Sequence, residues 1–178
     1  MIAILIVFYL FLGLFSIMGA MRGWAKEMLV IFSVVLALAF IVVLETYIPY
    51  INEFLRTNPD IQIWVRIIVV IGFAFFGYES PRFSRIGKAT ERRERLQDIL
   101  LGGILGVVSG YMIVGSLWSF INSAGYPLDY VIPPSSEWPM GEATLRMLNI
   151  LPPVWLGQPP TIFIAMVFAF LIVIVVFV

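Results

Sequence analysis

Five long apolar runs constrain this chain more than any other feature of its sequence. They cover residues 2–21, 28–44, 61–78, 99–121 and 161–178. Each is close to the roughly 20 residues that cross about 30 Å of hydrocarbon at about 1.5 Å per residue. Lipid does not tolerate unpaired backbone groups, and the runs lack the alternating pattern of barrel strands. We therefore predict an all-α, polytopic transmembrane helical bundle with five spans, forming one membrane domain over residues 1–178.

The first apolar run has an alternative interpretation as a cleaved signal peptide. No Lys or Arg precedes its apolar stretch, and the run has about twice the length of a usual signal core. We therefore favour a permanent first span.

Composition supports a membrane protein and removes several functional classes. Of 178 residues, 61% are hydrophobic and 12% are charged, whereas a soluble domain carries roughly 25% charged residues. Eleven Lys and Arg balance eleven Asp and Glu, so no net field attracts nucleic acid. With no cysteine and no histidine, the chain lacks disulfides, thiolate nucleophiles and the usual ligands of zinc, iron–sulfur clusters and haem. We expect no metal and no cofactor, and we expect bound lipid.

The distribution of basic residues predicts the orientation, because short positively charged loops stay on the cytoplasmic side. Two of the predicted links carry eight basic residues, and the other two carry only Arg56 and Arg146. The eight are Arg22, Lys26, Arg82, Arg85, Lys88, Arg92, Arg93 and Arg95. The N-terminus is therefore predicted outside and the C-terminus in the cytoplasm, with loops 45–60 and 122–160 external. The stretch 81–98, which interleaves both signs of charge, is interpreted as a solvated orientation signal.

The predicted external loop 122–160 is rich in proline and aromatic residues. Within it, residues 141–151 place Ala143, Leu145, Leu148 and Leu151 at helical spacing. We predict a short interfacial helix on the outer surface, with Trp and Tyr at headgroup depth. The alternative is a structured loop that packs on the bundle without any partner.

The segment Gly19-Ala-Met-Arg-Gly-Trp-Ala-Lys-Glu27 joins the first two spans. Gly19 and Gly23 have the four-residue spacing that lets helix backbones approach closely. Arg22 and Lys26 are predicted to share a helix face that could hold anionic headgroups or a partner's carboxylate, whereas Glu27 points elsewhere. The alternative is that these charges only anchor the hairpin on the positive side of the membrane.

Three glycines of the fourth span, Gly102, Gly106 and Gly110, repeat at the same spacing. Glycine costs about 1 kcal/mol relative to alanine in a helix interior, so a row of three indicates close packing against another helix. The neighbour is either the first span of the same chain, which we favour, or a different protein.

Arg66 is the one charge well inside a predicted span. Charged residues in spans usually pair or reach the interface. Glu45 lies at the outer end of the second span, and the short connection makes the second and third spans antiparallel neighbours. We therefore predict a Glu45–Arg66 pair that anchors the structure; substrate binding is the alternative.

The sequence also lacks the usual devices of catalysis and transport. No Asp or Glu falls in the middle third of a predicted span, no proline breaks one, and no Gly-rich phosphate loop follows a strand. We therefore predict that the chain is not an enzyme.

The 19–28 hairpin and the segment Leu96-Gln-Asp-Ile-Leu-Leu-Gly-Gly-Ile-Leu-Gly106 resemble the bacterial colicin V production protein family. Its members have a comparable Gly-x-x-Arg-Gly-x-x-x-Glu hairpin and a later Leu-Gly-x-x-x-Gly helix. The resemblance covers roughly residues 1–155. Family members commonly carry a basic residue where this chain has Ser109 before Gly110, and they usually have four spans, so the fifth resembles an addition. The resemblance implies a multi-pass protein of the bacterial inner membrane, linked to colicin V export and envelope maintenance.

These features lead to one favoured function and two alternatives. The favoured function is a non-enzymatic scaffold, assembly factor or accessory subunit of a larger membrane system, with other membrane-protein subunits and lipid as partners. The first alternative is a small pore or export component that forms a homo-oligomer. The second is an accessory subunit of an energy-converting or photosynthetic membrane complex.

Overall fold

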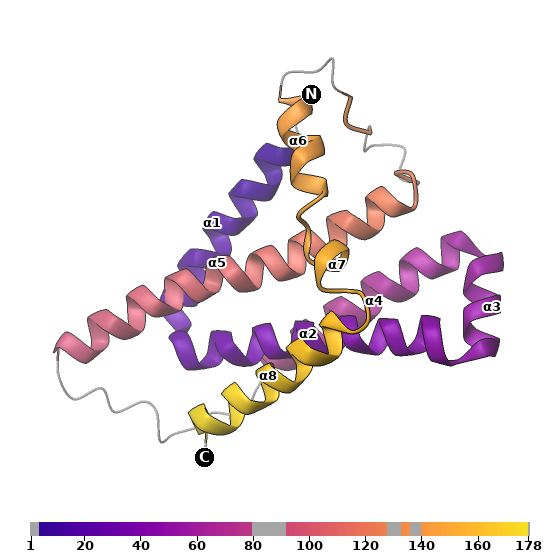
Figure 1. The fold of residues 1–178 in the computed structure, drawn as a ribbon. Helices are drawn as coiled ribbons and strands as arrows, with labels where there is room; N and C mark the ends of the chain where they lie inside the picture. The colour runs from indigo at the N-terminus through magenta and orange to yellow at the C-terminus, as the bar shows by residue number, and fades with distance from the viewer. Residues whose placement is uncertain (1–3, 80–91, 128–132, 136–139, 178) are drawn as a thin grey trace.

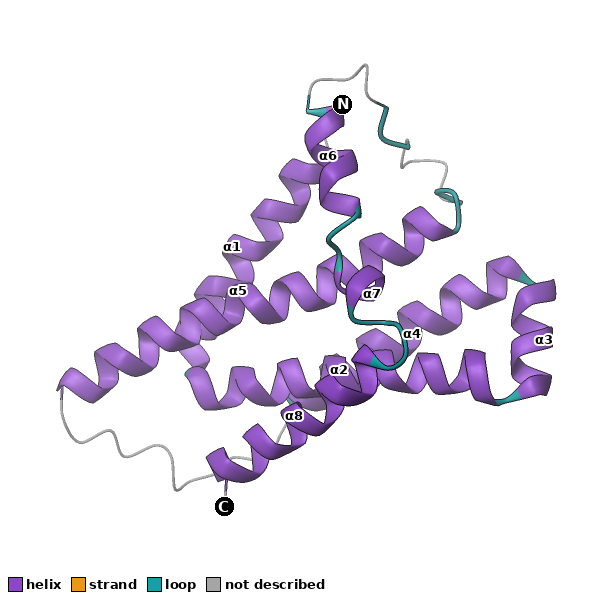
Figure 2. Ribbon diagram, viewed as in Figure 1, coloured by secondary structure: helices purple, strands orange, loops and turns teal. Residues whose placement is uncertain are grey.

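A computed structural model describes residues 4–79, 92–127, 133–135 and 140–177 of the chain (Figure 1). Every regular element in these ranges is a helix (Figure 2), which confirms the all-α prediction for this part of the chain. The helices are α1 (Ile4–Arg22), α2 (Trp24–Tyr47), α3 (Pro49–Thr57), α4 (Pro59–Tyr78), α5 (Arg92–Ser123), α6 (Gly141–Leu148), α7 (Pro152–Trp155) and α8 (Thr161–Phe177).

Within the described residues, four helices are long and apolar enough to cross a membrane. They are α1, α2, α4 and the Arg95–Ser123 part of α5, and they correspond to the first four predicted spans. The fifth predicted span forms α8, a helix of 17 residues with a length of about 25 Å. The chain is therefore a multi-pass, all-helical membrane protein by the length and apolar character of its helices.

Helix α2 lies at the centre of the bundle and packs against α4, α5 and α8 (Figure 1). Its apolar residues surround the helix, and a helix that is apolar all round is buried. The fully buried members include Val30, Val34 and Ala37. Residues of α4, α5 and α8 complete this core, among them Val70 and Ile162, which are also fully buried.

A second, smaller core joins α1, α5 and α6. Phe8 of α1 and Trp118 of α5 place their ring centroids 5.4 Å apart, and Leu148 and Leu151 pack beside them. The prolines that follow α6 form α7, which lies on α5. This core fixes the C-terminal half of α5 to the N-terminal half of α1.

The segments between the predicted spans differ from expectation in two ways. The connection 45–60 contains α3, which begins at Pro49, a residue favoured in the first turn of a helix. The predicted helix 141–151 exists as α6, but its buried residues are Gly141, Thr144 and Leu148. Ala143 and Leu145 of the predicted apolar face are exposed, whereas Leu148 of that face is buried in the second core.

The basic stretch predicted as an orientation signal, residues 81–98, lies mostly outside the described residues. Of this stretch, only residues 92–98, at the beginning of α5, are described. Three residues of the Pro- and aromatic-rich loop, Tyr130, Trp138 and Pro139, also lie outside the described part of the chain.

Candidate functional site

Gly23 alone separates α1 from α2, so the predicted hairpin link is a single residue. Its φ angle is +87°, a conformation that is open to glycine and strained for other residues. The Trp24 amide, at the start of α2, donates to Oδ1 of Asp98 on α5 at 3.1 Å. Asp98 thereby caps a helix from another segment of the chain, where a negative charge also complements the helix dipole.

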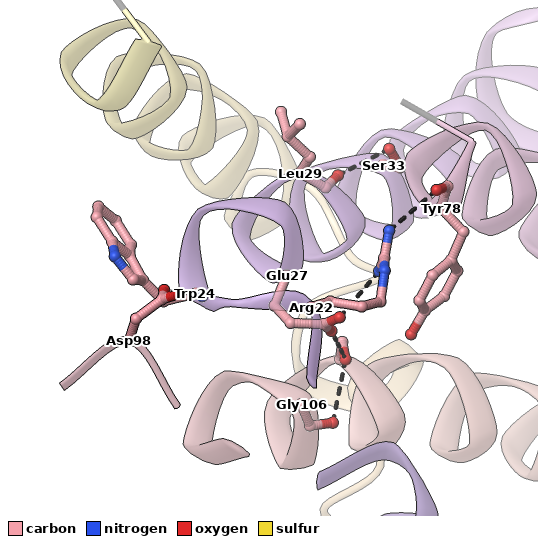
Figure 3. A network of polar contacts seen from close by, with 9 residues as sticks. Arg22, Trp24, Glu27, Leu29, Ser33, Tyr78, Asp98 and Gly106 are labelled. Atoms are coloured by element: carbon pink, nitrogen blue, oxygen red, sulfur yellow. Dashed lines mark hydrogen bonds and ion pairs between the residues drawn. The ribbon is translucent and has the colours of Figure 1, made fainter. Parts of the chain in front are cut away.

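Glu27, one turn into α2, is fully buried. Its Oε1 accepts from Nη1 of Arg22 at 2.9 Å (Figure 3). Its Oε2 accepts from the hydroxyl of Ser109 at 2.7 Å. A buried carboxylate is tolerated when it is paired and hydrogen-bonded. Both oxygens of Glu27 meet this condition, and the partners come from α1 and α5.

Arg22 also connects this carboxylate to α4. Its Nη2 donates to the carbonyl oxygen of Tyr78 at 2.9 Å, and its guanidinium lies 4.3 Å from the centroid of the Tyr78 ring (Figure 3). The first contact satisfies a carbonyl at the C-terminal end of α4, where cations are favourable. We call Arg22, Glu27, Tyr78 and Ser109 the Glu27 cluster; it ties four helices together at one end of the bundle.

The prediction that Arg22 and Lys26 share a face is wrong. Arg22 turns inward to Glu27, whereas Lys26 is exposed. The cause is Gly23, whose positive φ interrupts the helix between the two residues. Lys26 remains a basic residue at the surface, and Arg22 belongs to the interior contact.

The predicted glycines bring α1 and α5 into backbone contact. A β-carbon added to Gly19 would lie 2.7 Å from Cα of Gly106, and one added to Gly102 would lie 3.1 Å from the carbonyl carbon of Gly19. We call Gly19, Gly102 and Gly106 the glycine seam. Gly110 continues it, because a β-carbon there would lie 2.7 Å from Cβ of Phe15. The neighbour of the glycine row is therefore α1 of the same chain.

Sequence reasoning missed Asp98, Tyr78 and Ser109 as members of this site. Asp98 precedes the glycines at the same four-residue spacing, 98, 102, 106 and 110, and residues at that spacing lie on one helix face. This spacing could have placed Asp98 next to the α1–α2 turn. No comparable signal marks Tyr78.

The structure brings the predicted Glu45 and Arg66 together at the other end of α2. Arg66 Nε donates to Glu45 Oε1 at 2.7 Å, and Arg66 Nη2 donates to Glu45 Oε2 at 2.6 Å. Gln62 donates a third hydrogen bond to Oε1 at 3.2 Å, and the side-chain amide of Asn52 donates to the Glu45 carbonyl. The two-point contact of guanidinium with carboxylate is the strong form of this pair. The pair lines a cavity of about 310 Å³.

No protein family model, curated protein or solved structure matches this chain. The functional interpretation therefore depends on the two polar sites and on the packing around them.

Proposed function

We propose that this chain is a non-enzymatic multi-pass protein of the bacterial inner membrane that serves as a scaffold or accessory subunit of a larger membrane assembly. It would have five spans, with α8 as the fifth, its N-terminus outside and its C-terminus in the cytoplasm. The placement of eight basic residues on one side of the predicted topology and two on the other supports this orientation.

The observation that carries the proposal is that the Glu27 carboxylate is fully buried and that both of its oxygens accept hydrogen bonds within the chain. Ionisable residues inside a membrane bundle usually serve transport or proton transfer. Here the Glu27 side chain is fully buried and both of its oxygens are hydrogen-bonded within the chain. A carboxylate held in this way by α1 and α5 fixes the arrangement of helices, which favours an architectural role over a chemical one.

The hairpin that resembles the colicin V production family has a structural use for each of its defined residues in this chain. In the hairpin pattern Gly-x-x-Arg-Gly-x-x-x-Glu, Gly19 contacts α5, Arg22 pairs with Glu27, and Gly23 forms the turn. Each defined position of the pattern thus has a physical reason to hold its residue type. We propose membership in that family on the resemblance of the two segments, with the inner-membrane location and the link to colicin V export and envelope maintenance that it implies.

The surface left for partners is apolar and separate from the glycine seam. Large exposed apolar side chains include Ile68 and Phe75 on α4 and Phe168 on α8. Lipid chains or neighbouring membrane helices would cover them, because such side chains face hydrocarbon at no cost. The seam itself is used within the chain, so a partner subunit would bind to these outer faces.

Extraction of the tagged full chain in a mild detergent, followed by native sizing and mass spectrometry, tests the proposal. We expect other integral membrane proteins to comigrate in fixed ratio, and we expect a Gly106→Leu variant to lose them because the seam opens. Gly103→Ala is the matched control, since a β-carbon there makes only ordinary contacts, 3.6 Å from the nearest atom. If the chain is recovered only with copies of itself and conducts ions in liposomes, the scaffold proposal is wrong and the pore alternative is supported.

A further inference from the structure

The cavity beside Glu45 and Arg66 lies between α2, α4, α5 and α7. Its volume of about 310 Å³ is at the lower end of the roughly 300–1,000 Å³ range of small-molecule sites. It is large enough for a polar headgroup or a small metabolite and too small for a complete lipid. The apolar wall of the cavity is formed by Leu38 and Ile41 of α2 and by Phe120 of α5. The Glu45–Arg66 ion pair supplies a charged edge.

The ion pair at this edge retains hydrogen-bonding capacity. Arg66 has five N–H donors, and two of them are used by Glu45. The two bonds to Glu45 use Nε and Nη2. Within the described part of the chain, Nη1 of Arg66 donates to no residue. Glu45 Oε2 accepts one hydrogen bond there, from Arg66, and a carboxylate oxygen can accept two. The edge can therefore donate to an anionic oxygen and accept from an ammonium group at the same time.

Ser119 provides a second, independent observation. It lines the cavity and is 6% exposed. Its neighbours on α5, Ser116 and Ser123, each donate to the carbonyl four residues earlier. The Ser119 hydroxyl makes no such bond within the described residues. The Ser119 hydroxyl therefore keeps its proton available at the cavity wall, where an anionic oxygen of a ligand could accept it.

We propose that the cavity binds a zwitterionic phosphoester, supplied by the headgroup of an ethanolamine phospholipid. Its phosphodiester oxygens would accept from Arg66 Nη1 and the Ser119 hydroxyl, and its ammonium would donate to Glu45 Oε2. The charges of Glu45 and Arg66 cancel, so a zwitterion leaves the cavity neutral, whereas an anionic headgroup would leave an uncompensated charge. The apolar wall formed by Leu38 and Ile41 would contact the first methylenes of the lipid. This assignment is independent of the proposed scaffold function.

Native mass spectrometry of the full chain, titrated with ethanolamine, choline and glycerol phospholipids, tests the proposal. We expect one ethanolamine lipid to bind about tenfold more tightly than the anionic glycerol lipid, because the zwitterion matches both charges of the ion pair. It should also bind more tightly than the choline lipid, whose ammonium has no N–H to donate to Glu45. Ser119→Ala should weaken ethanolamine lipid binding by about tenfold, through the loss of a hydrogen bond to a charged group. Ser119→Thr, which keeps the hydroxyl, should restore it. Ser116→Ala is the matched control, because Ser116 lies one turn away on α5 and bonds to the Met112 carbonyl.

The same titration with soluble glycerophosphoethanolamine identifies the source of the ligand. Binding of the soluble compound as tightly as the lipid, with the same dependence on Ser119, supports the zwitterion site and overturns its assignment to a lipid. Equal retention of all three phospholipids, or binding that Ser119→Ala leaves unchanged, overturns the site itself. Unfolding curves of each variant separate a loss of binding from a loss of structure.

Discussion

Arg22 and Glu27 form an ion pair across the one-residue turn between α1 and α2, with 2.9 Å between Nη1 and Oε1. The two side chains differ in exposure, because 21% of Arg22 and none of Glu27 reaches the surface. Such a pair differs from an exposed salt bridge, which contributes little to stability. The loss in free energy of unfolding when one partner is removed should therefore depend on which charge remains unpaired.

We predict that Arg22→Leu destabilises the chain more than Glu27→Gln. The first change leaves a buried carboxylate with only the Ser109 hydroxyl, and uncompensated buried charges cost about 3–5 kcal/mol. The second leaves a cation that is partly exposed and can extend toward the interface, for a cost of about 2 kcal/mol. Reversible unfolding in mixed micelles, followed by circular dichroism, measures both free energies.

The double variant Arg22→Leu/Glu27→Gln provides the control for this pair. It removes both charges, so its cost should fall below that of Arg22→Leu alone. Equal costs for the two single changes would contradict the buried position of Glu27.

The glycine seam predicts a sharp difference between neighbouring glycines of α5. Gly106→Ala would place a β-carbon against the Phe15 carbonyl oxygen and 3.1 Å from Gly19 Cα. Backbone atoms cannot move aside as a side chain can, so α1 and α5 must separate, at a cost of about 1–3 kcal/mol. The same unfolding measurement tests this expectation.

Gly103→Ala is the control for the seam, because its β-carbon would lie at ordinary distances from Ser16 and Ala20. We expect it to be neutral or stabilising by up to about 1 kcal/mol, since alanine is the better helix former. If both changes cost the same, the close approach of α1 and α5 at Gly106 is wrong.

The helices and the glycine contact could be predicted because they depend on spacing along one chain segment. Apolar length predicts a spanning helix, and four-residue spacing predicts which glycines share a face. The Glu45–Arg66 pair followed from one further step, that a short connection makes α2 and α4 antiparallel neighbours. These predictions needed no knowledge of how the remaining helices pack.

The burial of Glu27 could not be predicted in this way, because it depends on a backbone angle and on two distant segments. The positive φ of Gly23 turns Arg22 away from Lys26, and sequence spacing alone assumes a continuous helix. Ser109 is 82 positions from Glu27 in sequence. The position of Ser109 beside the carboxylate follows from the α1–α5 contact and from no local pattern.

Gly23→Ala should lower the free energy of unfolding more than Gly125→Ala, the same change at another glycine with positive φ. Both Gly23 and Gly125 adopt positive φ, +87° and +72°, so an alanine at either costs about 1–2 kcal/mol in backbone strain. At Gly23 the β-carbon would also lie 2.8 Å from both carboxylate oxygens of Asp98, whereas at Gly125 it would meet open space. We expect the difference to appear in the free energy of unfolding.

Adding Asp98→Ala to the Gly23→Ala variant tests the cause of that difference. Asp98→Ala alone loses the cap on the Trp24 amide, so the double variant is compared with that single variant. In the Asp98→Ala background, Gly23→Ala should cost only its backbone strain. If it costs as much there as in the unchanged chain, the carboxylate does not restrict Gly23.

The proposed orientation can be tested by chemical labelling, because the chain has no cysteine. A single cysteine can therefore be placed at Thr57, which is exposed at the end of α3, or at Lys26, which is exposed at the start of α2. Eight basic residues on the Lys26 side predict that this side faces the cytoplasm. In intact cells, we expect a membrane-impermeant maleimide to label Thr57→Cys and not Lys26→Cys. Both variants should react after detergent lysis, which controls for access to the thiol. Labelling of Lys26→Cys alone in intact cells would show that the topology is opposite to the proposed one.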